Sequence, residues 1–398
     1  SSCFRMKKYQ ADWVFPVTSP AIANGIVIMD DHGRIEAVLP EGEAGEDVLQ
    51  LPGLICPGFI NAHVHLELSW MKGLIAEDTG LDGFISELEQ TKPVATPELI
   101  AMAIERAVHQ MATTGTVGYG DICNTANTLQ FKQSSRMRVQ NFVEVFGSHP
   151  AKAQSAYKNA QKLHRVFRAM LPNQQSSIVP HATYSVSSEL FRQITQNAVD
   201  EQSILSIHHA ESLAEIDLFS KSQGLMHKRL EQWGIPPDYL PFAGKRPIDT
   251  LKGLLPTQNR WMFVHNTFLQ EPDLKVIKDN FTDVWFTLCP RSNYYIERSQ
   301  PPFELIRSFS DNILLGTDSL ASVGSLNMVE EIRFVMQSNK GITFDEALKW
   351  ATINGAKFFG WDSELGSIEV GKRPGLVNII GFEANNSQVA DSMEIKLV

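Results

Sequence analysis

Short apolar runs recur along the middle of the chain and alternate with longer amphipathic segments. The runs lie at residues 55–63, 115–121, 138–146, 177–182, 203–209, 261–267, 283–289 and 312–317. Helical patterns such as "PELIAMAIERAVHQMATTG" and "LNMVEEIRFVMQ" separate most of these runs. Buried strands that alternate with helices favour a closed parallel barrel over an open sheet. We therefore predict an α/β fold, with a (β/α)8 TIM-like barrel over residues 56–361.

The two ends of the chain have a different pattern from the middle. Residues 21–39 predict two short strands around a turn at residues 30–33, and residues 367–380 predict β structure again. Two β-rich ends that flank a barrel indicate one small domain assembled from both termini. We predict a small β-sandwich domain formed by residues 1–55 and 362–398.

Residues 220–258 interrupt the alternation of strands and helices. This segment contains "WGIPPDYLPFAGKRP" and is too long and irregular for a plain connection, and long loops of this kind often serve as lids. Its aromatic residues Trp233, Tyr239 and Phe242 would then pack over bound substrate and exclude water. The alternative is a surface insertion with its own small core.

Composition narrows the class of protein. The 398 residues carry a formal net charge of −10 without a long Lys/Arg run, which argues against a nucleic-acid-binding surface. It does not exclude a small acidic ligand, which needs only one or two local cations. Four scattered cysteines without a C-x-x-C pair predict a reducing, cytoplasmic location. Since no uninterrupted run reaches the ~20 apolar residues of a membrane span, we expect no membrane association.

The stretch "FINAHVHLEL" places His63 and His65 two residues apart at the end of the first predicted strand. Side chains at positions i and i+2 of a strand share one face, so both imidazoles project the same way and could hold one metal ion. A pair of hydrogen-bonded core or surface histidines would have the same spacing. The rest of the chain has to decide between these two interpretations.

Other ionisable side chains fall at the same ends of later strands, where a barrel of this kind places its chemistry. They are His181 after the fourth strand, His208, His209 and Glu211 after the fifth, His265 after the sixth and Asp318 after the eighth. A lone histidine is more often a packing residue, and an aspartate in "GTDS" is ordinarily a turn or cap residue. Together, however, His and Asp side chains suit Zn²⁺ or Fe²⁺ with one position open for water. Glu211 beside such a metal has the placement of a proton shuttle. At most one of the adjacent His208 and His209 can point into the barrel, and the other is expected to pack outward.

Several motifs in this chain resemble those of the amidohydrolase superfamily. They are "PGFINAHVHLE", "HHAES", "FVHN", "LCPRSN" and "LLGTDSLAS", followed by "EALKWATINGAKFFG" and "LGSIEVGKRPGLVNI". Their order and spacing agree over nearly the whole chain. The likeness is greatest to the deaminase/chlorohydrolase branch, which acts on purines, adenosyl compounds, cytosine and triazines. Within that branch, "NAHVHLELSWMKG" is similar to the aminofutalosine deaminases of the bacterial menaquinone route.

The resemblance implies a role for each strand-end residue. Carried over position by position, it makes the metal ligands His63, His65, His208 and Asp318. It also makes Glu211 the catalytic acid and base, His265 a catalytic contact of the attacking water, and His181 a substrate contact. Because no lysine ends the fourth strand, we predict one divalent metal ion, Zn²⁺ with Fe²⁺ as the alternative, rather than a binuclear centre. The branch commonly forms dimers, so a homodimer is expected.

One departure from the pattern of the branch affects the expected substrate pocket. Where the branch often has His-Asn-Pro before Ser-Asn, this chain has "LCPRSN", which places Arg291 and Asn293 after the seventh strand. We predict that both residues bind substrate, with the Arg291 guanidinium at the pocket mouth to hold a carboxylate. Lys245 and Arg246 of the predicted lid are competing partners for that carboxylate. Pairing of Arg291 with a nearby acid, Glu297 or Glu304, is the alternative.

The function that follows is metal-dependent hydrolytic deamination of an amino-substituted N-heterocycle. The expected substrate is an adenine-containing nucleoside such as aminofutalosine. Asp318 and His265 would orient or deprotonate the attacking water, and Glu211 would protonate the ring nitrogen and then the departing ammonia. The alternatives are a chlorohydrolase or cyclic amidohydrolase on the same scaffold, or a catalytically silent binding module.

Overall fold

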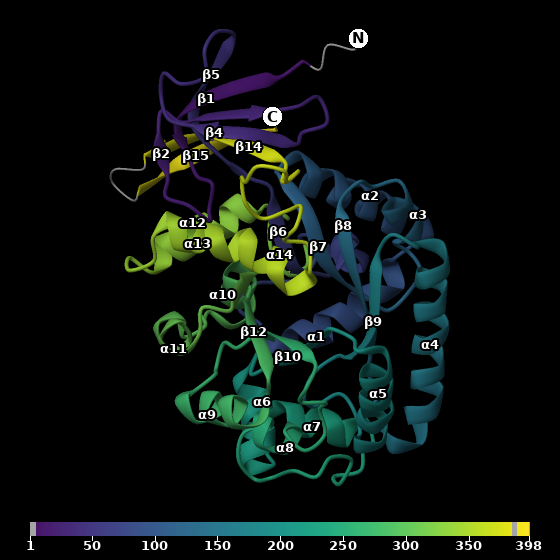
Figure 1. Ribbon diagram of the computed structural model, residues 1–398. Helices are drawn as coiled ribbons and strands as arrows, with labels where there is room; N and C mark the ends of the chain where they lie inside the picture. The colour runs from purple at the N-terminus through teal and green to yellow at the C-terminus, as the bar shows by residue number, and fades with distance from the viewer. Residues whose placement is uncertain (1–4, 384–387, 398) are drawn as a thin grey trace.

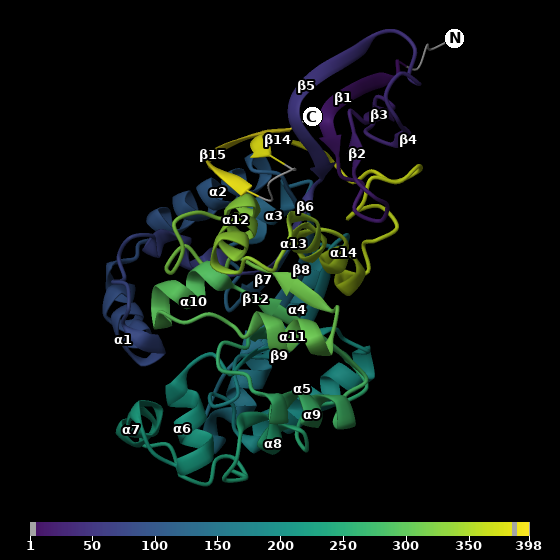
Figure 2. The same cartoon turned by 90° about the vertical axis from the view of Figure 1, so that its left-hand side faces the viewer.

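The computed structural model describes residues 5–383 and 388–397. Figures 1 and 2 show a helix-wrapped strand assembly with a separate sheet above it, to which both ends of the chain contribute. The strands of this upper sheet are purple and yellow in Figure 1, so residues far apart in sequence lie side by side there.

All eight predicted barrel strands are present. They are β6 (Phe59–Val64), β7 (Thr116–Cys123), β8 (Arg138–Val145), β9 (Gln175–Pro180), β10 (Leu205–His209), β11 (Arg260–His265), β12 (Asp283–Leu288) and β13 (Ile313–Leu315). They form two four-stranded parallel sheets, in the orders β6-β7-β8-β9 and β10-β11-β12-β13. A bridge between Ala182 and His208 joins the sheets at one seam, and the Asp318 N–H donates to the His63 carbonyl at the other, over 2.9 Å. The predicted TIM-barrel α/β fold is therefore confirmed.

Helices connect the strands and cover the barrel. The α-helices are α1 (Gly80–Thr91), α2 (Pro97–Thr113), α3 (Leu129–Gln133), α4 (Ala153–Met170), α5 (Ser188–Glu201), α6 (Leu213–Lys221), α7 (Leu225–Gln232), α8 (Pro247–Leu251), α9 (Glu271–Asn280), α10 (Pro290–Glu297), α11 (Phe303–Phe309), α12 (Met328–Ser338), α13 (Phe344–Ala351) and α14 (Ile353–Phe359). Short 3₁₀ helices are η1 (Leu66–Met71), η2 (Lys92–Val94) and η3 (Pro150–Lys152). None of the helices in the described part of the chain combines the length and apolarity that a membrane crossing requires.

Local sequence explains where these helices begin and how they pack. At the start of α2, the Thr96 hydroxyl accepts from the Leu99 N–H and a proline occupies the first turn, which is a favoured N-terminal arrangement. The buried side chains Ile104, Ala107 and Met111 then follow at helical spacing and face the barrel. Their burial holds α2 against the strands.

The strands from the two chain ends join in one seven-stranded sheet. Its members are β1 (Lys7–Val14), β2 (Ile22–Ala23), β3 (Ile26–Met29), β4 (Ile35–Leu39), β5 (Val48–Pro57), β14 (Leu376–Glu383) and β15 (Gln388–Leu397). The antiparallel pairing of β5 with β14 links the termini, as expected. The described strands form one continuous sheet, so the predicted sandwich of two facing sheets is not confirmed. The proposed domain boundary after residue 55 falls inside β5, which leads almost directly into β6.

The segment 220–258 packs into the main hydrophobic core rather than around a core of its own. It contains α7 and α8, and the Tyr239 hydroxyl donates to the Tyr184 carbonyl over 2.7 Å. The Phe242 ring lies 5.1 Å from that of Phe219 and 5.5 Å from that of Tyr239. Two of its three aromatic side chains therefore pack against the body of the protein, whereas Trp233 is 49% exposed.

Candidate active site

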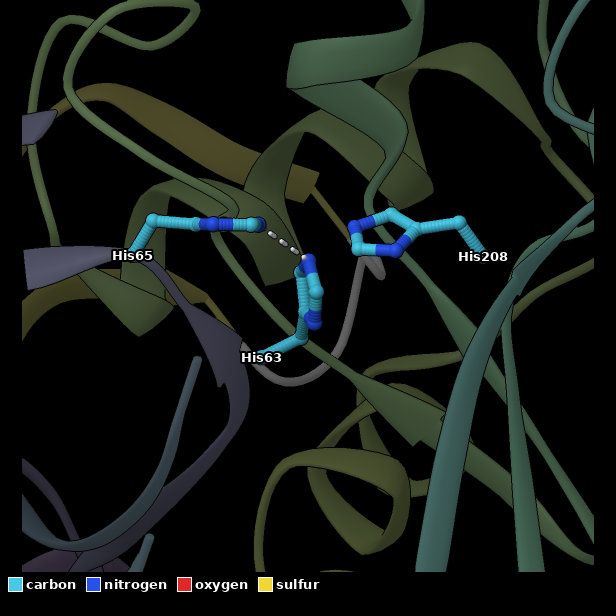
Figure 3. Close-up of side chains that lie close together, drawn as sticks. All are labelled: His63, His65 and His208. Carbon is cyan, nitrogen blue, oxygen red and sulfur yellow. Dashed lines mark hydrogen bonds between the residues drawn. The ribbon is translucent and has the colours of Figure 1, made fainter. Parts of the chain in front are cut away.

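Side chains from the ends of β6 and β10, and Asp318 after β13, converge at one end of the barrel. The Nε2 atoms of His63 and His65 are 3.1 Å apart, and one oxygen of Asp318 lies 3.5 Å and 3.4 Å from them. Figure 3 shows the His208 ring pointing into the same space, and the ligand atoms of the three histidines lie within 4.8 Å of one another. The structure thus brings the four predicted metal ligands together.

Neighbouring groups fix the orientation of these side chains. The His208 Nδ1–H donates to the His181 carbonyl over 2.5 Å, which leaves Nε2 as the nitrogen with a free lone pair. The second carboxylate oxygen of Asp318 accepts from the Ser292 hydroxyl over 2.7 Å, so its first oxygen remains directed at His63 and His65. Asp318 itself has a positive φ of 63°, a conformation that is costly for a non-glycine residue.

The protonation of the cluster fits a bound cation. Burial lowers the pKa of His65 to about 3 and also lowers that of His208, so both imidazoles are neutral. Burial opposes ionisation of Asp318, but its hydrogen bond to His63 and the nearby His265 outweigh burial and hold its pKa well below its usual range. Neutral imidazoles and an ionised carboxylate are the donors that a divalent metal requires. These residues therefore fit a divalent metal ion.

Glu211 lies beside the ligand cluster, and its surroundings favour the protonated form. Its Oε1 is 3.4 Å from His265 Nε2, and the same nitrogen is 3.9 Å from Asp318 Oδ2. Burial, together with the negative charge of Asp318, raises the pKa of Glu211 well above its usual value. A protonated carboxyl group in this position can donate a proton to a substrate, which is the chemistry predicted for Glu211.

Two residues that hold catalytic groups in place complete the site. Asn293 Oδ1 accepts from His265 Nδ1–H over 3.0 Å, which points His265 Nε2 toward Glu211 and Asp318. The Glu215 carboxylate accepts from the backbone N–H groups of Ala210 and Glu211, over 2.8 Å and 3.1 Å. Sequence reasoning missed Glu215, although "SLAE" carries the signal: Ser212 caps α6 and Glu215 follows three residues later.

Glu144, which sequence reasoning also missed, lines the site from β8. Its side chain accepts from the Asn124 amide over 3.3 Å, while its Oε2 lies 3.8 Å from His208 Nδ1 and has no hydrogen-bond partner. Burial raises the pKa of Glu144 to about 8. A charged residue at the end of the predicted strand 138–146 was the available signal, and it is the same signal that identified the other site residues.

The base of a pocket of about 290 Å³ is lined by His65, His181, His208, Glu211, His265 and Asp318. We call the group His63, His65, His181, His208, Glu211, His265 and Asp318 the catalytic floor. The other side of the pocket, which we call the outer wall, consists of Leu81, Phe84, Ile85 and Leu88 of α1 together with Phe146 and Trp233. His181 lies on the floor as predicted, with its Nδ1 2.6 Å from the Ser185 hydroxyl, and it lines the pocket.

The structure corrects the predicted position of Arg291. Its guanidinium forms an ion pair with the buried Glu331 over 2.7 Å and donates to the Ser325 carbonyl, also over 2.7 Å. It is absent from the described pocket lining, so it does not reach the pocket mouth. The physical reason is the buried carboxylate of α12, which offers the guanidinium a nearer partner than Glu297 or Glu304.

Three other predictions about side chains around the pocket have different outcomes. Asn293 is buried behind His265 and does not line the pocket, so the structure places it as a support rather than a substrate contact. His209 packs outward, with Nδ1 3.0 Å from Asn266 Oδ1, as expected. In the segment 220–258, Trp233 lines the pocket, but Tyr239 and Phe242 do not, which contradicts a lid made of all three.

The basic side chains of that segment also point elsewhere. The Arg246 guanidinium pairs with Asp273 over 2.6 Å and donates to the Phe268 carbonyl over 2.7 Å. Neither Arg246 nor Lys245 is part of the described lining of the pocket. The expected competition between these residues and Arg291 for a substrate carboxylate is therefore not supported by their positions.

Comparison with known proteins identifies relatives of the whole chain. A sequence profile described as "Amidohydrolase family" matches residues 54–398. A 5-methylthioadenosine/S-adenosylhomocysteine deaminase of Thermoanaerobacter pseudethanolicus is 26% identical over 337 residues, which cover 81% of this chain and 72% of that protein.

Solved structures show the same fold. The crystal structure of Helicobacter pylori aminofutalosine deaminase matches with a TM-score of 0.81 and 21% identity, over 99% of this chain and 100% of that one. An adenosine deaminase from Xanthomonas campestris with bound zinc matches with a TM-score of 0.74 and 23% identity, over 97% of this chain and 87% of that one. At these identities the likeness extends to the architecture of barrel and terminal sheet.

Proposed function

This chain belongs to the amidohydrolase family, and we propose that it is a metal-dependent hydrolytic deaminase of adenine-containing nucleosides. The observation that carries the proposal is the position of Glu211, a buried carboxyl group that lies 3.4 Å from His265 and beside a ligand set that fits one divalent cation. Burial raises the pKa of this group. Relatives named as deaminases of adenosyl compounds support the same reaction class. A silent binding module would have no use for both the ligand set and the acid.

The proposed mechanism assigns a task to each residue of the catalytic floor. His63, His65, His208 and Asp318 would hold the metal ion, which supplies Lewis acidity and makes water a stronger nucleophile near neutral pH. The Nε2 atom of His265 lies between Glu211 and Asp318 and has no hydrogen-bond partner, so it can position the attacking water. Asp318 accepts the proton that this water releases.

Glu211 handles the protons on the substrate side. Its carboxyl proton goes to the ring nitrogen next to the reacting carbon, so that negative charge does not build up on the ring during attack. The carbon–oxygen bond forms first, and the exocyclic carbon–nitrogen bond breaks afterwards. The proton held by Asp318 passes to the leaving amine, which departs as ammonia, and the remaining hydroxyl proton returns to the Glu211 carboxylate as the carbonyl forms. One water is consumed and one ammonia released, and no redox cofactor is required.

The finer features of the enzyme belong to the same proposal. We propose Zn²⁺ as the metal, in line with the zinc in the Xanthomonas campestris adenosine deaminase. The relatives point to adenine nucleosides modified at the 5′ position, among which aminofutalosine is a candidate. A cytoplasmic homodimer and the two-domain division at residues 55 and 362 rest on the sequence and remain proposals.

The test combines metal analysis with a screen for ammonia release. Purified protein should contain about one divalent metal per chain, and it should release ammonia from adenosine, 5′-methylthioadenosine, S-adenosylhomocysteine or aminofutalosine. A 6-chloropurine nucleoside is included to detect a chlorohydrolase. Chloride release without ammonia release, or metal-loaded protein that turns over none of these compounds, would overturn the proposal.

A further inference from the structure

Of the two candidate metal ligands near the end of β6, His63 lies within the strand and His65 lies beyond it. The pairing of β6 with β7 ends at Val64 and Asp121, so His65 stands at the junction with η1, outside the ladder. In the part of the chain that the structure describes, no hydrogen bond fixes the His65 ring through Nδ1, in contrast to the ring of His208. The direction of the His65 ring therefore depends on how its backbone is held.

Asp121, near the C-terminal end of β7, holds the backbone next to His65. Its Oδ1 accepts from the Leu66 N–H over 2.9 Å, and its side chain is fully buried. Leu66 is the first residue of η1, and an N–H in the first turn of a helix has no partner within that helix. The His65 side chain does not cap η1, so Asp121 supplies from the neighbouring strand the acceptor that the local sequence lacks.

A buried lysine holds the Asp121 carboxylate in place. Lys132 of α3 donates from Nζ to Asp121 Oδ2 over 2.6 Å, and neither side chain is exposed to solvent. The same Nζ lies 5.2 Å from the centre of the Phe167 ring. Because a buried charge without a partner is costly, the two side chains fix each other. A rotation of the carboxylate that released Leu66 would also disturb the contact with Lys132.

A second carboxylate ties the same two segments in the opposite direction. Glu67, the second residue of η1, accepts from the backbone N–H groups of Asn124 and Thr125 over 3.0 Å and 2.7 Å, and from the Thr125 hydroxyl over 2.7 Å. Asn124 and Thr125 follow β7 directly. The end of β7 and the start of η1 thus exchange hydrogen bonds between carboxylate and N–H in both directions, which restricts movement of one segment past the other.

We propose that Asp121 is a positioning residue for the metal site: its hydrogen bond to the Leu66 N–H fixes the backbone at His65, and with it the direction of the His65 ring. Lys132 acts through Asp121, as the partner that keeps the carboxylate in this orientation. Asp121 lies outside the described pocket lining, so it contacts neither the pocket nor a substrate. The inference rests on the proposed function only for the presence of the metal ion, and goes beyond it by assigning a task to a residue outside the ligand set. The alternative is an ion pair that stabilises the fold without affecting the metal site.

The test compares two double variants that differ in the acceptor offered to the Leu66 N–H. Asp121→Leu/Lys132→Met removes the ion pair and the acceptor, whereas Asp121→Asn/Lys132→Met removes the ion pair and retains a side-chain oxygen. Apolar residues of similar volume often replace a buried ion pair without loss of stability, so we expect both proteins to fold. Zn²⁺ is added to metal-free protein in competition with a chromophoric chelator. We expect the Leu variant to bind Zn²⁺ at least about tenfold more weakly than wild type, and the Asn variant to stay within about threefold of wild type.

Co²⁺ in place of Zn²⁺ reports the geometry of the site. Its visible absorption depends on the number and arrangement of its ligands, and a loss of stability alone does not change it. We expect an altered Co²⁺ spectrum in Asp121→Leu/Lys132→Met and a spectrum close to wild type in Asp121→Asn/Lys132→Met.

Leu66→Pro tests the same hydrogen bond from its donor side. Proline is tolerated at the first position of a helix but has no N–H, and Leu66→Ala also loses the leucine side chain while it keeps the N–H. Leu66→Pro should therefore bind Zn²⁺ at least about tenfold more weakly than Leu66→Ala. This comparison decides the question if Asp121→Leu/Lys132→Met does not fold.

The pair of Asp273 and Arg246 is the matched control. Asp273 is also buried, and its carboxylate accepts from a backbone N–H, that of Gln270, over 2.9 Å and from Arg246 over 2.6 Å. Among the described residues, no metal ligand is a hydrogen-bond partner of this pair. Asp273→Leu/Arg246→Met and Asp273→Asn/Arg246→Met should change the melting temperature and leave Zn²⁺ affinity as in wild type.

The outcomes separate this inference from the proposed reaction. Equal Zn²⁺ affinity and equal Co²⁺ spectra in the two Asp121 variants, or equal affinity in Leu66→Pro and Leu66→Ala, would overturn the inference. A loss of affinity in the Asp273 variants as large as that in Asp121→Leu/Lys132→Met would also overturn it. Wild-type protein that binds no divalent metal would overturn the inference together with the proposed function. Metal-bound wild-type protein that releases no ammonia would overturn the proposed function alone, because neither affinity nor spectrum requires turnover.

Discussion

The catalytic floor and the outer wall face the same pocket, but they are built in different ways. Floor side chains come from strand ends, are mostly buried, and several have a second polar contact that fixes them, such as His208 with the His181 carbonyl and Asp318 with Ser292. Wall side chains come from α1 and from the residues after β8 and α7, and their pocket contacts are apolar. The floor is therefore fixed before substrate arrives, whereas the wall presents surface that a ligand can cover.

This difference indicates that the catalytic floor carries out the chemistry and that the outer wall contributes to substrate affinity. A reaction that depends on proton transfer needs groups held within hydrogen-bond distance, so the polar network of the floor pre-organises the chemistry. Apolar contact is not directional, so the wall can accept groups of different shape and mainly changes affinity. Changes to the floor should thus affect kcat or metal content, and changes to the wall should affect KM.

The largest effect is expected from loss of a metal ligand. Asp318→Ala removes the ionised carboxylate that faces His63 and His65, and His65→Ala removes one of the converging nitrogens. We expect both variants to lose bound metal and all measurable activity, while circular dichroism stays close to wild type because the barrel core is unchanged. Full metal content by elemental analysis with full turnover in either variant would show that the ligand set is wrong.

A smaller but still large loss is expected for Glu211→Gln. The amide cannot shuttle protons, but it does not belong to the ligand set, so the variant should keep its metal. General acid–base catalysis typically contributes about 10²–10⁴-fold, and we expect kcat to fall within that range with KM little changed. Steady-state ammonia release and metal content, measured on the same preparation, check this. Near-normal deamination would remove Glu211 from the mechanism.

The same contrast explains what the sequence could predict. The catalytic floor could be predicted because polar residues at the ends of apolar runs stand out, and because the parallel topology of a barrel brings those ends together. His63 lies close to His208 and to Asp318, although both are far from it in sequence. The eight strands were predicted for the same reason, since buried parallel strands give continuous apolar runs.

The outer wall and the supporting residues were harder to predict from the sequence, for a physical reason. Which face of α1 meets the pocket depends on how the helix packs, and the stripe at Leu81, Phe84 and Leu88 would look the same if it faced the core. Arg291 followed a strand end, as the true site residues do, but a buried partner from α12 turned it away. Position at a strand end predicts proximity to the site, whereas the direction of a long side chain depends on its tertiary partners.

Arg291→Met tests whether this arginine belongs to the pocket or to the fold. Removing it leaves the fully buried Glu331 carboxylate without its partner, and breaking a buried pair typically costs about 3–5 kcal/mol of unfolding free energy. We expect a loss of about that size in chemical denaturation, with KM unchanged for acidic and neutral nucleosides alike.

Arg298→Met is the matched control, because its partner Glu77 is 57% exposed and a surface pair contributes about 1 kcal/mol or less. A selective rise of KM for carboxylate-bearing substrates in Arg291→Met, with stability unchanged, would instead show that Arg291 binds the substrate carboxylate.

The smallest expected effect concerns Glu215, the support beneath Glu211, and it depends on pH. Burial raises the pKa of Glu215 from 4.5 to about 7, although its hydrogen bonds with the Glu211 N–H and with Thr183 partly oppose the shift. The folded protein therefore binds this proton more tightly than the unfolded chain does. The contribution of Glu215 to the free energy of unfolding is greatest below pH 4.5, falls as the pH rises toward 7, and is level above that, with a total change of about 3 kcal/mol.

Glu215→Gln isolates this contribution, because the amide has the shape of the protonated acid and does not titrate. Unfolding free energies measured from pH 4.5 to 8 should show wild type losing about 3 kcal/mol relative to Glu215→Gln between pH 4.5 and 7, and a constant difference beyond. Glu304→Gln, which changes a carboxyl group with 79% side-chain exposure, controls for the general effect of removing one negative charge. A difference between wild type and Glu215→Gln that stays flat across the window would mean that the two backbone N–H donors keep Glu215 ionised. Glu215 would then be an anion that accepts the hydrogen bond of the Glu211 N–H. It would support the catalytic floor through its negative charge rather than as a protonated acid.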